Sequence, residues 1–350
     1  MRKLTLVILA IILGGFFAPQ AAGKEEAPGH YTLYDRDGSV ITMAGRELDP
    51  GDHYIAADNR LFEIKEIRGV EVYVEYLETI ELPAISEEFL KTQAAKGGGV
   101  IGIYHTHNAE SYVPTSGTDA KEDGRGDILA VGKSLAAALE QAGITALWSE
   151  NSHLPHDGQA YLRSRRTAAE LLKKGPETLI DVHRDATPPE VYEAEVEGMP
   201  VTKVRLVVGR QNQNRAANLE YAKRIKAVAD KLYPGIIEGI FDARGNYNQD
   251  LGPKMILLEF GAHTNKLEHA EQAAKLFAKV IPAAAGLGTG EQTAQKQLGG
   301  AAGRALVWLI AVAAVVGIAF VLIDQGRLGS LGAFFRREAG LGEDDERERD

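Results

Sequence analysis

The stretch "IGIYHTHNAESY" at residues 101–112 places two histidines and a glutamate directly after an apolar run. A short apolar run of this kind is typical of a buried strand. Polar side chains such as His105, His107 and Glu110 are costly to bury at the end of a strand, unless they bind a ligand or form hydrogen bonds with one another. Ligands of open α/β sheets bind beyond the carboxyl ends of the strands. The stretch therefore predicts a strand that ends at a functional site.

Strand and helix patterns alternate around this stretch. Apolar strand patterns cover residues 99–105, 145–150, 177–185, 203–210 and 255–263. Amphipathic patterns with apolar spacing near 3.6 cover residues 127–144, 161–175, 213–235 and 266–286. Such alternation indicates an α/β domain with a mostly parallel, twisted sheet and helices on both faces. We place this domain at residues 99–285.

The segment before the α/β domain has a different pattern. Residues 29–79 alternate apolar and polar positions between turn signals such as Asp37-Gly38 and Pro50-Gly51. This pattern predicts a small β unit of four or five short strands, for packing or as an adaptor. Residues 80–98 end in three glycines and are predicted to be a linker.

Both ends of the chain carry apolar segments. Residues 1–23 have two basic residues before an apolar run, which predicts a signal peptide or an uncleaved anchor. Residues 305–323 form a charge-free run of 19 residues, long enough for a transmembrane helix. Residues 286–303 are predicted to be a flexible tether, and residues 324–350 an acidic cytoplasmic tail. We therefore expect a protein of the cell membrane whose α/β domain is extracytoplasmic.

Composition argues against several classes of function. The 350-residue chain has a formal net charge of -10, whereas proteins that bind nucleic acid usually show a basic stripe. The chain has no cysteine, so it forms no disulfide and has no thiolate ligand or nucleophile.

Three of the predicted strands end in polar clusters: "HTHNAE", "DVHRD" and "LLEFGAHTN". If these strands are neighbours, one sheet edge gathers His107, Glu110, His183 and Glu259. Two histidines and a carboxylate with an open fourth position are the ligands of a hydrolytic zinc site. A further carboxylate, Glu259, has the chemistry of a general base, and its place after an apolar run predicts a raised pKa.

Seven ordered stretches carry a resemblance to a known family. They are "IYHTHNAESY" (103–112), "YLRSR" (161–165), "IDVHRDA" (180–186), "VVGRQN" (207–212), "YPGI" (233–236), "YNQDL" (247–251) and "LLEFGAHTN" (257–265). Together they make the α/β region resemble the stage II sporulation protein P family, which is itself similar to zinc-dependent N-acetylmuramoyl-L-alanine amidases.

The resemblance implies an activity and partners. It implies a peptidoglycan hydrolase that cleaves the amide between muramic acid and L-alanine of the stem peptide during spore engulfment. It also implies Zn²⁺ as cofactor. The implied partners are a lytic transglycosylase (stage II sporulation protein D) and the membrane protein stage II sporulation protein M.

The resemblance also implies roles for residues. It implies that zinc is held by His107, Glu110 and His183, and that Glu259 is the catalytic carboxylate. His105 stays an alternative ligand or a support for the ligands, because amidases place their second ligand farther along the chain. Four residues are candidates for binding substrate or for purely structural pairing: Arg184, Asp185, Asn248 and Gln249. Five histidines outside these clusters are predicted to be surface residues: His30, His53, His153, His156 and His269.

Other functions share parts of this pattern. A peptidase that cuts within the stem peptide would use the same metal site, so the sequence leaves the two bonds open. A zinc deacetylase acting on sugars shares the metal chemistry but does not account for the ordered stretches. A catalytically inactive, membrane-tethered wall-binding scaffold is disfavoured, because this chain keeps Glu259 and all three implied ligands.

Overall fold

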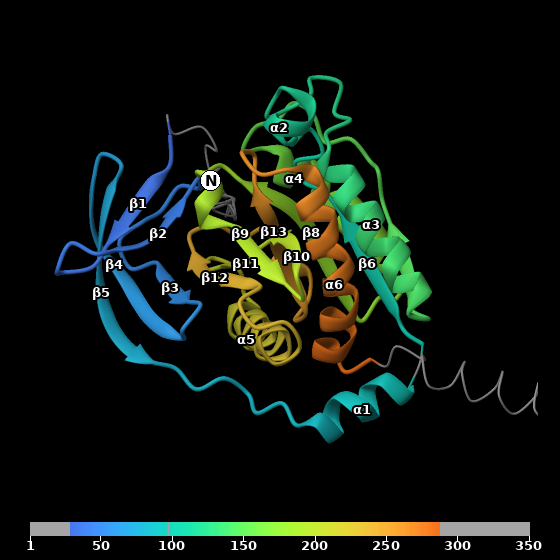
Figure 1. Ribbon diagram of the computed structural model, residues 1–350. Coiled ribbons are helices and arrows are strands. Elements are labelled where there is room, and N and C mark those ends of the chain that lie inside the picture. The colour runs from blue at the N-terminus through green and yellow to red at the C-terminus, as the bar shows by residue number, and fades with distance from the viewer. Residues whose placement is uncertain (1–28, 97, 288–350) are drawn as a thin grey trace, which may run out of the picture. The chain divides into compact units, whose positions relative to one another are not determined.

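The computed structural model describes residues 29–96 and 98–287. Its central element is an eleven-stranded sheet with the order β2-β1-β5-β4-β3-β12-β11-β13-β8-β6-β7 (Figure 1). The strands of this sheet are β1 (Tyr31–Tyr34), β2 (Val40–Ala44), β3 (His53–Ala56), β4 (Arg60–Arg68), β5 (Glu71–Thr79), β6 (Val100–Tyr104), β7 (Thr145–Trp148), β8 (Thr178–Asp185), β11 (Val204–Gly209), β12 (Ile237–Ala243) and β13 (Met255–Ala262). A separate hairpin joins β9 (Glu193–Val196) to β10 (Met199–Thr202).

Helices cover both faces of the sheet, as the sequence predicts. The helices are α1 (Glu87–Lys96), α2 (Val113–Ser116), α3 (Ile128–Gln141), α4 (Ala160–Leu172), α5 (Arg215–Leu232) and α6 (Leu267–Ala285), with short 3-10 turns η1 (Pro189–Val191) and η2 (Gln249–Leu251). Helices α3, α5 and α6 share one apolar core (Figure 1). Helix α4 packs on the other face, where Ala168 and Leu171 meet Tyr104 and Leu179.

The prediction of a mostly parallel sheet is wrong for the sheet as a whole. Five of its ten strand pairings are antiparallel. Parallel neighbours need a long crossover, usually a helix. The connection from β12 to β13 has only the short turn η2, so β13 runs antiparallel to β11. The N-terminal strands are also joined by short turns and add further antiparallel pairs.

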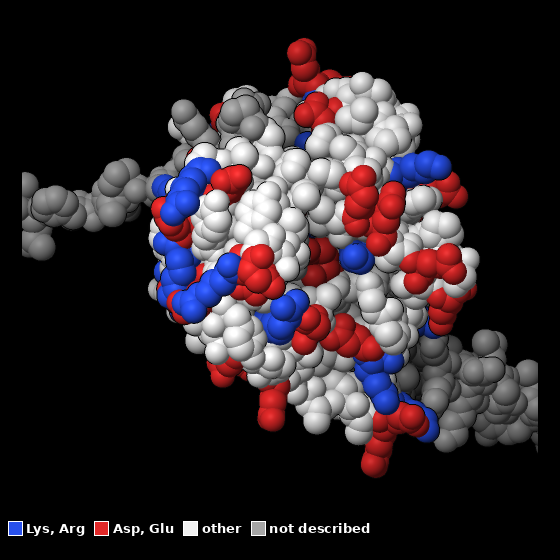
Figure 2. Space-filling model, turned by 60° about the vertical axis from the view of Figure 1, so that its left-hand side comes forward, with Lys and Arg blue, Asp and Glu red and all other residues white. Residues whose placement is uncertain are grey.

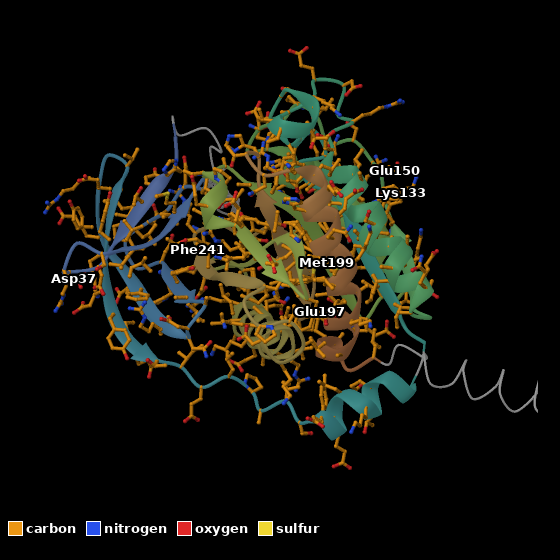
Figure 3. All side chains as sticks on the ribbon, viewed as in Figure 1. Asp37, Lys133, Glu150, Glu197, Met199 and Phe241 are labelled. Atoms are coloured by element: carbon orange, nitrogen blue, oxygen red, sulfur yellow. The ribbon has the colours of Figure 1, made fainter. Side chains whose placement is uncertain are left out.

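The N-terminal β unit is part of the central sheet. Strand β3 pairs antiparallel with β12, with Ile55 opposite Ile240. A second apolar core then forms between the β unit and the sheet, where the rings of Tyr54 and Phe241 lie 4.7 Å apart. Figure 3 marks Phe241 at this junction. The sequence prediction missed β12, and it also missed α1 within the predicted linker.

Arg205 is a fully buried cation on β11 that ties β2 of the β unit to β8 and β12 of the same sheet. Its guanidinium donates to Glu238 (2.5 Å) and to Asp185, and also to Thr42 Oγ1 and the Met43 carbonyl of β2 (both 2.8 Å). Removing one member of a buried ion pair leaves an uncompensated charge.

We expect Arg205→Met to lower the free energy of unfolding by about 3–5 kcal/mol, because buried carboxylates lose their shared cation. Urea denaturation followed by circular dichroism measures this change. Arg68→Ala is the control, because Arg68 pairs with Glu66 at the exposed surface, where ion pairs contribute little. Equal unfolding midpoints for Arg205→Met and the unmodified chain would contradict the prediction.

Charged side chains of both signs are interspersed on the surface. Figure 2 shows Lys and Arg beside Asp and Glu on the face that it presents. On the β unit, Lys65 pairs with Glu63 (2.6 Å) and Arg60 with Asp58 (2.7 Å). Within each pair the opposite charges cancel at short range. This part of the surface is therefore not a continuous basic stripe of the kind that binds phosphate backbones.

The predicted end segments lie outside the described residues. These are the signal peptide or anchor (1–23), most of the tether (286–303), the transmembrane helix (305–323) and the acidic tail (324–350). Among the described residues, no helix combines the length and apolarity needed to cross a bilayer.

Candidate metal and catalytic site

His107 and Glu110 lie in the loop that follows β6, at the carboxyl end of the strand. Both side chains are completely buried, and Glu110 Oε1 lies 3.6 Å from His107 Nδ1. The other oxygen, Oε2, accepts a hydrogen bond from the backbone N–H of Arg184 (3.0 Å). This bond fixes the carboxylate across the end of the neighbouring strand β8.

His183, on β8, faces the same carboxylate. Its Nδ1 lies 3.3 Å from Glu110 Oε1, and its Nε2 lies 3.0 Å from Asp181 Oδ1. Asp181 is held in turn by the N–H (2.8 Å) and hydroxyl (2.6 Å) of Thr106. A carboxylate on one ring nitrogen orients a histidine so that the other nitrogen can bind a metal. Asp181 therefore presents Nδ1 of His183 toward Glu110.

The spacing of these donor atoms suits a zinc ion. Zinc–nitrogen and zinc–oxygen bonds of about 2.0–2.2 Å in a tetrahedron separate the ligand atoms by roughly 3.3–3.6 Å. The distances from Glu110 Oε1 to Nδ1 of His183 and His107, 3.3 and 3.6 Å, match this separation. Glu110 thus lies close to both predicted histidine ligands, His107 and His183, whereas the donor atoms that all lie within 4.8 Å of one another are those of His107, Glu110 and His156.

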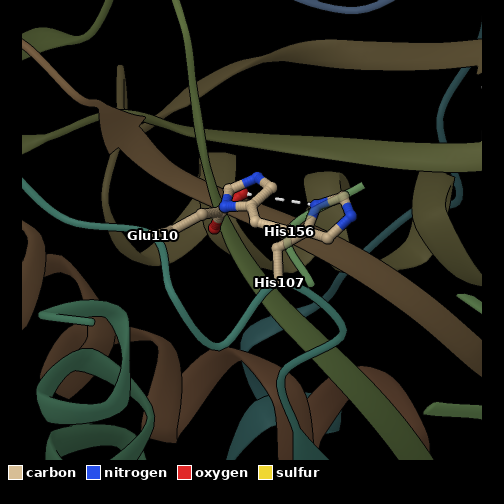
Figure 4. Close-up of side chains that lie close together, drawn as sticks. All are labelled: His107, Glu110 and His156. Carbon is tan, nitrogen blue, oxygen red and sulfur yellow. Dashed lines mark ion pairs between the residues drawn. The ribbon is translucent and has the colours of Figure 1, made fainter. Parts of the chain in front are cut away.

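His156 also belongs to this cluster, although the sequence prediction placed it at the surface. One donor atom from each of His107, Glu110 and His156 lies within 4.8 Å of the others (Figure 4). The half-buried His156 ring stacks on His107 with centroids 4.7 Å apart. His156 precedes α4 in a loop with no strand-end pattern, so only the tertiary fold reveals it.

His153, also predicted at the surface, is buried and bonded to the His105 carbonyl (2.8 Å).

Burial and charge act together on the cluster. Burial raises the pKa of the Glu110 carboxyl, but His183 and Arg184 lower it more, so the net pKa is below its usual range. Burial lowers the pKa of His183, yet the carboxylates of Asp181 and Glu110 raise it well above the usual value. The two buried carboxylates, Asp181 and Glu110, therefore stabilise a positive charge on the His183 ring that lies between them.

Glu259 lies on β13 beside His183, its register partner on β8. The side chain is 4% exposed. Oε1 accepts a hydrogen bond from Arg46 Nη2 (2.5 Å), and Oε2 accepts one from the Tyr192 hydroxyl (3.0 Å). Burial raises the pKa of Glu259 above its usual value, as the apolar run predicts, and the Arg46 guanidinium opposes that rise. Arg46 comes from the N-terminal β unit, for which no functional residue is predicted.

His105 points away from the cluster. Trp148 Nε1 donates to its Nε2 (3.1 Å), so Nδ1 carries the proton and donates to the Val182 carbonyl (3.2 Å). A Cβ on Gly132 of α3 would lie 2.3 Å from the same ring. Burial lowers the pKa of His105 to about 4. With its two nitrogens bonded to Trp148 of β7 and Val182 of β8, His105 supports the strands and has no nitrogen left to bind a metal ion at the cluster.

Arg184 and Asp185 do not pair with each other by any described contact. The Arg184 side chain donates to the carbonyl of Asp119 (3.0 Å). Asp185 accepts from the Gly45 N–H (2.9 Å) and the Tyr192 hydroxyl (2.9 Å), and it pairs with Arg205. The oxygens of Asp185 are therefore engaged within the protein.

Asn248 and Gln249 are buried and brace the loop between β12 and β13. Asn248 donates to the carbonyl of Tyr161 (3.0 Å) and the hydroxyl of Ser164 (3.1 Å), which positions α4. Gln249 accepts from the Gly209 N–H (2.9 Å) and donates to the Val207 carbonyl (2.8 Å). These bonds give both residues a structural function.

The fold and the cluster define a mixed α/β protein with a buried histidine–carboxylate site at the edge of its sheet. The sequence profile of the stage II sporulation protein P (SpoIIP) family matches residues 52–282, more than half of the chain. The chain belongs to this family, as its ordered stretches indicate.

Individual relatives agree with this assignment. Stage II sporulation protein P of Bacillus subtilis (strain 168) is 33% identical over 200 residues, which cover 52% of this chain and 50% of the relative. The match thus spans about half the length of the curated relative.

The solved structures to which this chain is similar include amidases from Mycobacterium smegmatis and Clostridioides difficile. The N-acetylmuramyl-L-alanine amidase Ami1 from Mycobacterium smegmatis aligns with 55% of this chain and 99% of its own, at 13% identity and a TM-score of 0.38. The CwlD amidase from Clostridioides difficile, solved in complex with the GerS lipoprotein, aligns with 52% of this chain and 95% of its own, at 15% identity and a TM-score of 0.33.

Proposed function

We propose that this protein is a zinc-dependent peptidoglycan hydrolase of sporulation that cleaves the amide between muramic acid and L-alanine of the stem peptide. The observation that carries the proposal is the shared carboxylate oxygen of Glu110, which lies 3.3 and 3.6 Å from two histidine nitrogens. Family membership adds the biological context, because the matched family is named for sporulation.

His107, Glu110 and His183 would hold the zinc. A zinc ion bound there polarises a carbonyl and lowers the pKa of bound water to about 7. Asp181 and the Arg184 N–H keep the His183 ring and the Glu110 carboxylate in place. These contacts are expected to preorganise the ligands before the ion binds.

Glu259 would move the proton. Its carboxylate takes a proton from the attacking water as the water oxygen bonds to the amide carbon. The same group then delivers that proton to the leaving nitrogen as the carbon–nitrogen bond breaks. The products are the muramic carboxyl group and a stem peptide with a free L-alanine amine. A carboxyl with a raised pKa suits both the acceptance and the return of a proton.

We further propose where and with whom the protein acts. The apolar segments at residues 1–23 and 305–323 support attachment to the cell membrane with the α/β domain outside. We also propose cooperation with the transglycosylase stage II sporulation protein D and with stage II sporulation protein M, the partners that the sequence resemblance implies. Co-purification of the tagged full chain with each partner from sporulating cells tests this part.

The activity is tested with the full chain and purified peptidoglycan, with and without a chelator, and the products are read by mass spectrometry. We expect free stem peptides that begin at L-alanine, absent with chelator and restored by added zinc. Cuts within the stem peptide would instead indicate the endopeptidase. No product, even with the transglycosylase added, would favour the inactive scaffold. The full chain is required because the β unit shares the central sheet.

A further inference from the structure

Glu259, the candidate base, forms an ion pair with Arg46, a residue far away in the sequence. Arg46 follows β2, and its Nη2 donates to Glu259 Oε1 across 213 positions of the chain. Both side chains are nearly buried, at 11% and 4% exposure. Hydrogen bonds between a guanidinium and a carboxylate are roughly twice as strong as neutral ones. The N-terminal β unit therefore reaches the residue that would carry the chemistry.

The loop that carries Arg46 is seated directly on the end of β8. The Gly45 N–H donates to Asp185 Oδ1 (2.9 Å). A Cβ at Gly45 would lie 2.6 Å from Ala186 Cβ and 2.7 Å from the Ala186 backbone nitrogen, closer than real contacts allow. Only glycine permits this approach, so the backbone next to Arg46 is fixed against the site.

Aromatic rings connect Arg46 with the metal cluster. Arg46 Nη1 donates to the Tyr247 hydroxyl (3.3 Å), and its guanidinium lies 5.5 Å from the centre of that ring. The Tyr247 ring contacts Tyr161 at 5.3 Å, and Tyr161 contacts His107 at the same centroid distance. Arg46 thus lies between Glu259, the candidate base, and the aromatic rings of Tyr247 and Tyr161, which lead to His107.

We propose that Arg46 is a positioning residue that holds the Glu259 carboxylate in the orientation needed for proton transfer. The N-terminal β unit then contributes a positioning residue to the active site. The inference rests on the proposed role of Glu259. Misplacement of a reacting group by about 1 Å can lower a rate about 100-fold. Without Arg46, the Glu259 carboxylate loses its fixed partner and can rotate about its side chain.

A guanidinium could instead mask the base, which would make Arg46 inhibitory. One observation and one general property of carboxylates favour positioning. The loop is docked through Gly45 against Ala186 and Asp185, so Arg46 is part of the packed structure and not a detachable lid. A carboxylate oxygen also has two lone pairs, so Oε1 and Oε2 of Glu259 can each accept a further proton donor. The two readings predict opposite changes in rate.

The test measures stem-peptide release by the full chain in which Arg46 is changed to alanine or lysine. For Arg46→Ala we expect kcat to fall about 100-fold with KM nearly unchanged, and millimolar methylguanidine to restore part of the rate. Arg46→Lys should recover only part of the rate, because the ammonium keeps the charge but loses the planar group that donates to both Glu259 and Tyr247. Arg244→Ala, which removes a guanidinium bonded to Asp49 in the same loop (3.2 Å), is the control with unchanged rate.

Zinc content and the thermal unfolding midpoint are measured for every variant, so that loss of metal or fold is recognised. A kcat for Arg46→Ala equal to or above that of the unmodified chain would overturn the positioning role, and an increase would establish masking. The proposed function fails separately, if the unmodified chain releases no peptide or if Glu259→Gln stays active. Activity that survives in Glu259→Gln removes the role of Arg46 as well.

Discussion

Replacing Glu259 with glutamine is expected to lower the rate of peptide release about 10²–10⁴-fold while zinc stays bound. The amide oxygen can still accept from Arg46, and the amide nitrogen can donate to the Tyr192 hydroxyl, so the packing around residue 259 is kept. An amide, however, cannot take a proton from water. The loss should therefore appear in kcat, with an unchanged unfolding midpoint.

Glu190→Gln makes the same chemical change at an exposed position of η1 and is expected to leave the rate unchanged. Metal content is measured by atomic absorption on both variants and on the unmodified chain. Zinc loss in Glu259→Gln as large as that in a ligand variant would show that residue 259 binds metal. Full activity in Glu259→Gln would remove Glu259 from the chemistry.

The strands that carry the site could be predicted because each is a continuous apolar run that ends in polar residues. Strands β6, β8 and β13 are adjacent in the sheet, so their carboxyl-terminal residues meet as the sequence suggests. The apolar runs themselves do not show which strands will be neighbours in the sheet. Strand β13 follows β12 in the chain but pairs with β8 and β11, and that choice depends on the whole fold.

The place of the N-terminal β unit could not be predicted because β12 was not recognised. Its sequence "IEGIFDA" is short and contains a glycine and two acids. Gly239 is required there, since a Cβ would lie 2.4 Å from the Tyr54 hydroxyl of β3. Such a requirement arises only from contact between distant segments, and local patterns do not reveal it.

Two residues near the site lack any local signal. His156 lies in a loop, and Arg46 lies in a turn-rich segment after β2. Both reach the site through contacts with residues far away in the chain: His156 with His107, and Arg46 with Glu259. By contrast, the predicted substrate residues Asn248 and Gln249 have turn-like composition, and their hydrogen bonds are internal. Composition alone cannot distinguish a loop that binds substrate from a loop whose side chains form internal hydrogen bonds.

The choice between His183 and His156 as third ligand gives the other large expected effect. We expect His183→Ala to weaken zinc binding more than about 100-fold, beyond the 10–100-fold range of an outer partner. His156→Ala should stay within about tenfold. The reason is geometric: Nδ1 of His183 lies 3.3 Å from Glu110 Oε1 and is oriented by Asp181, whereas the half-buried His156 ring stacks on His107.

Zinc affinity is measured on the full chain by competition with a chromophoric chelator, and circular dichroism confirms that each variant is folded. Asp181→Asn is expected to fall between the two, about 10–100-fold weaker, because it loosens the ring without removing a ligand. His269→Ala, on α6 and outside the cluster, serves as the control. Strong zinc binding in His183→Ala together with its loss in His156→Ala would make His156 the third ligand. His183 would then be a charged partner of Asp181 and Glu110, and the site would open toward the loop before α4 instead of toward Glu259.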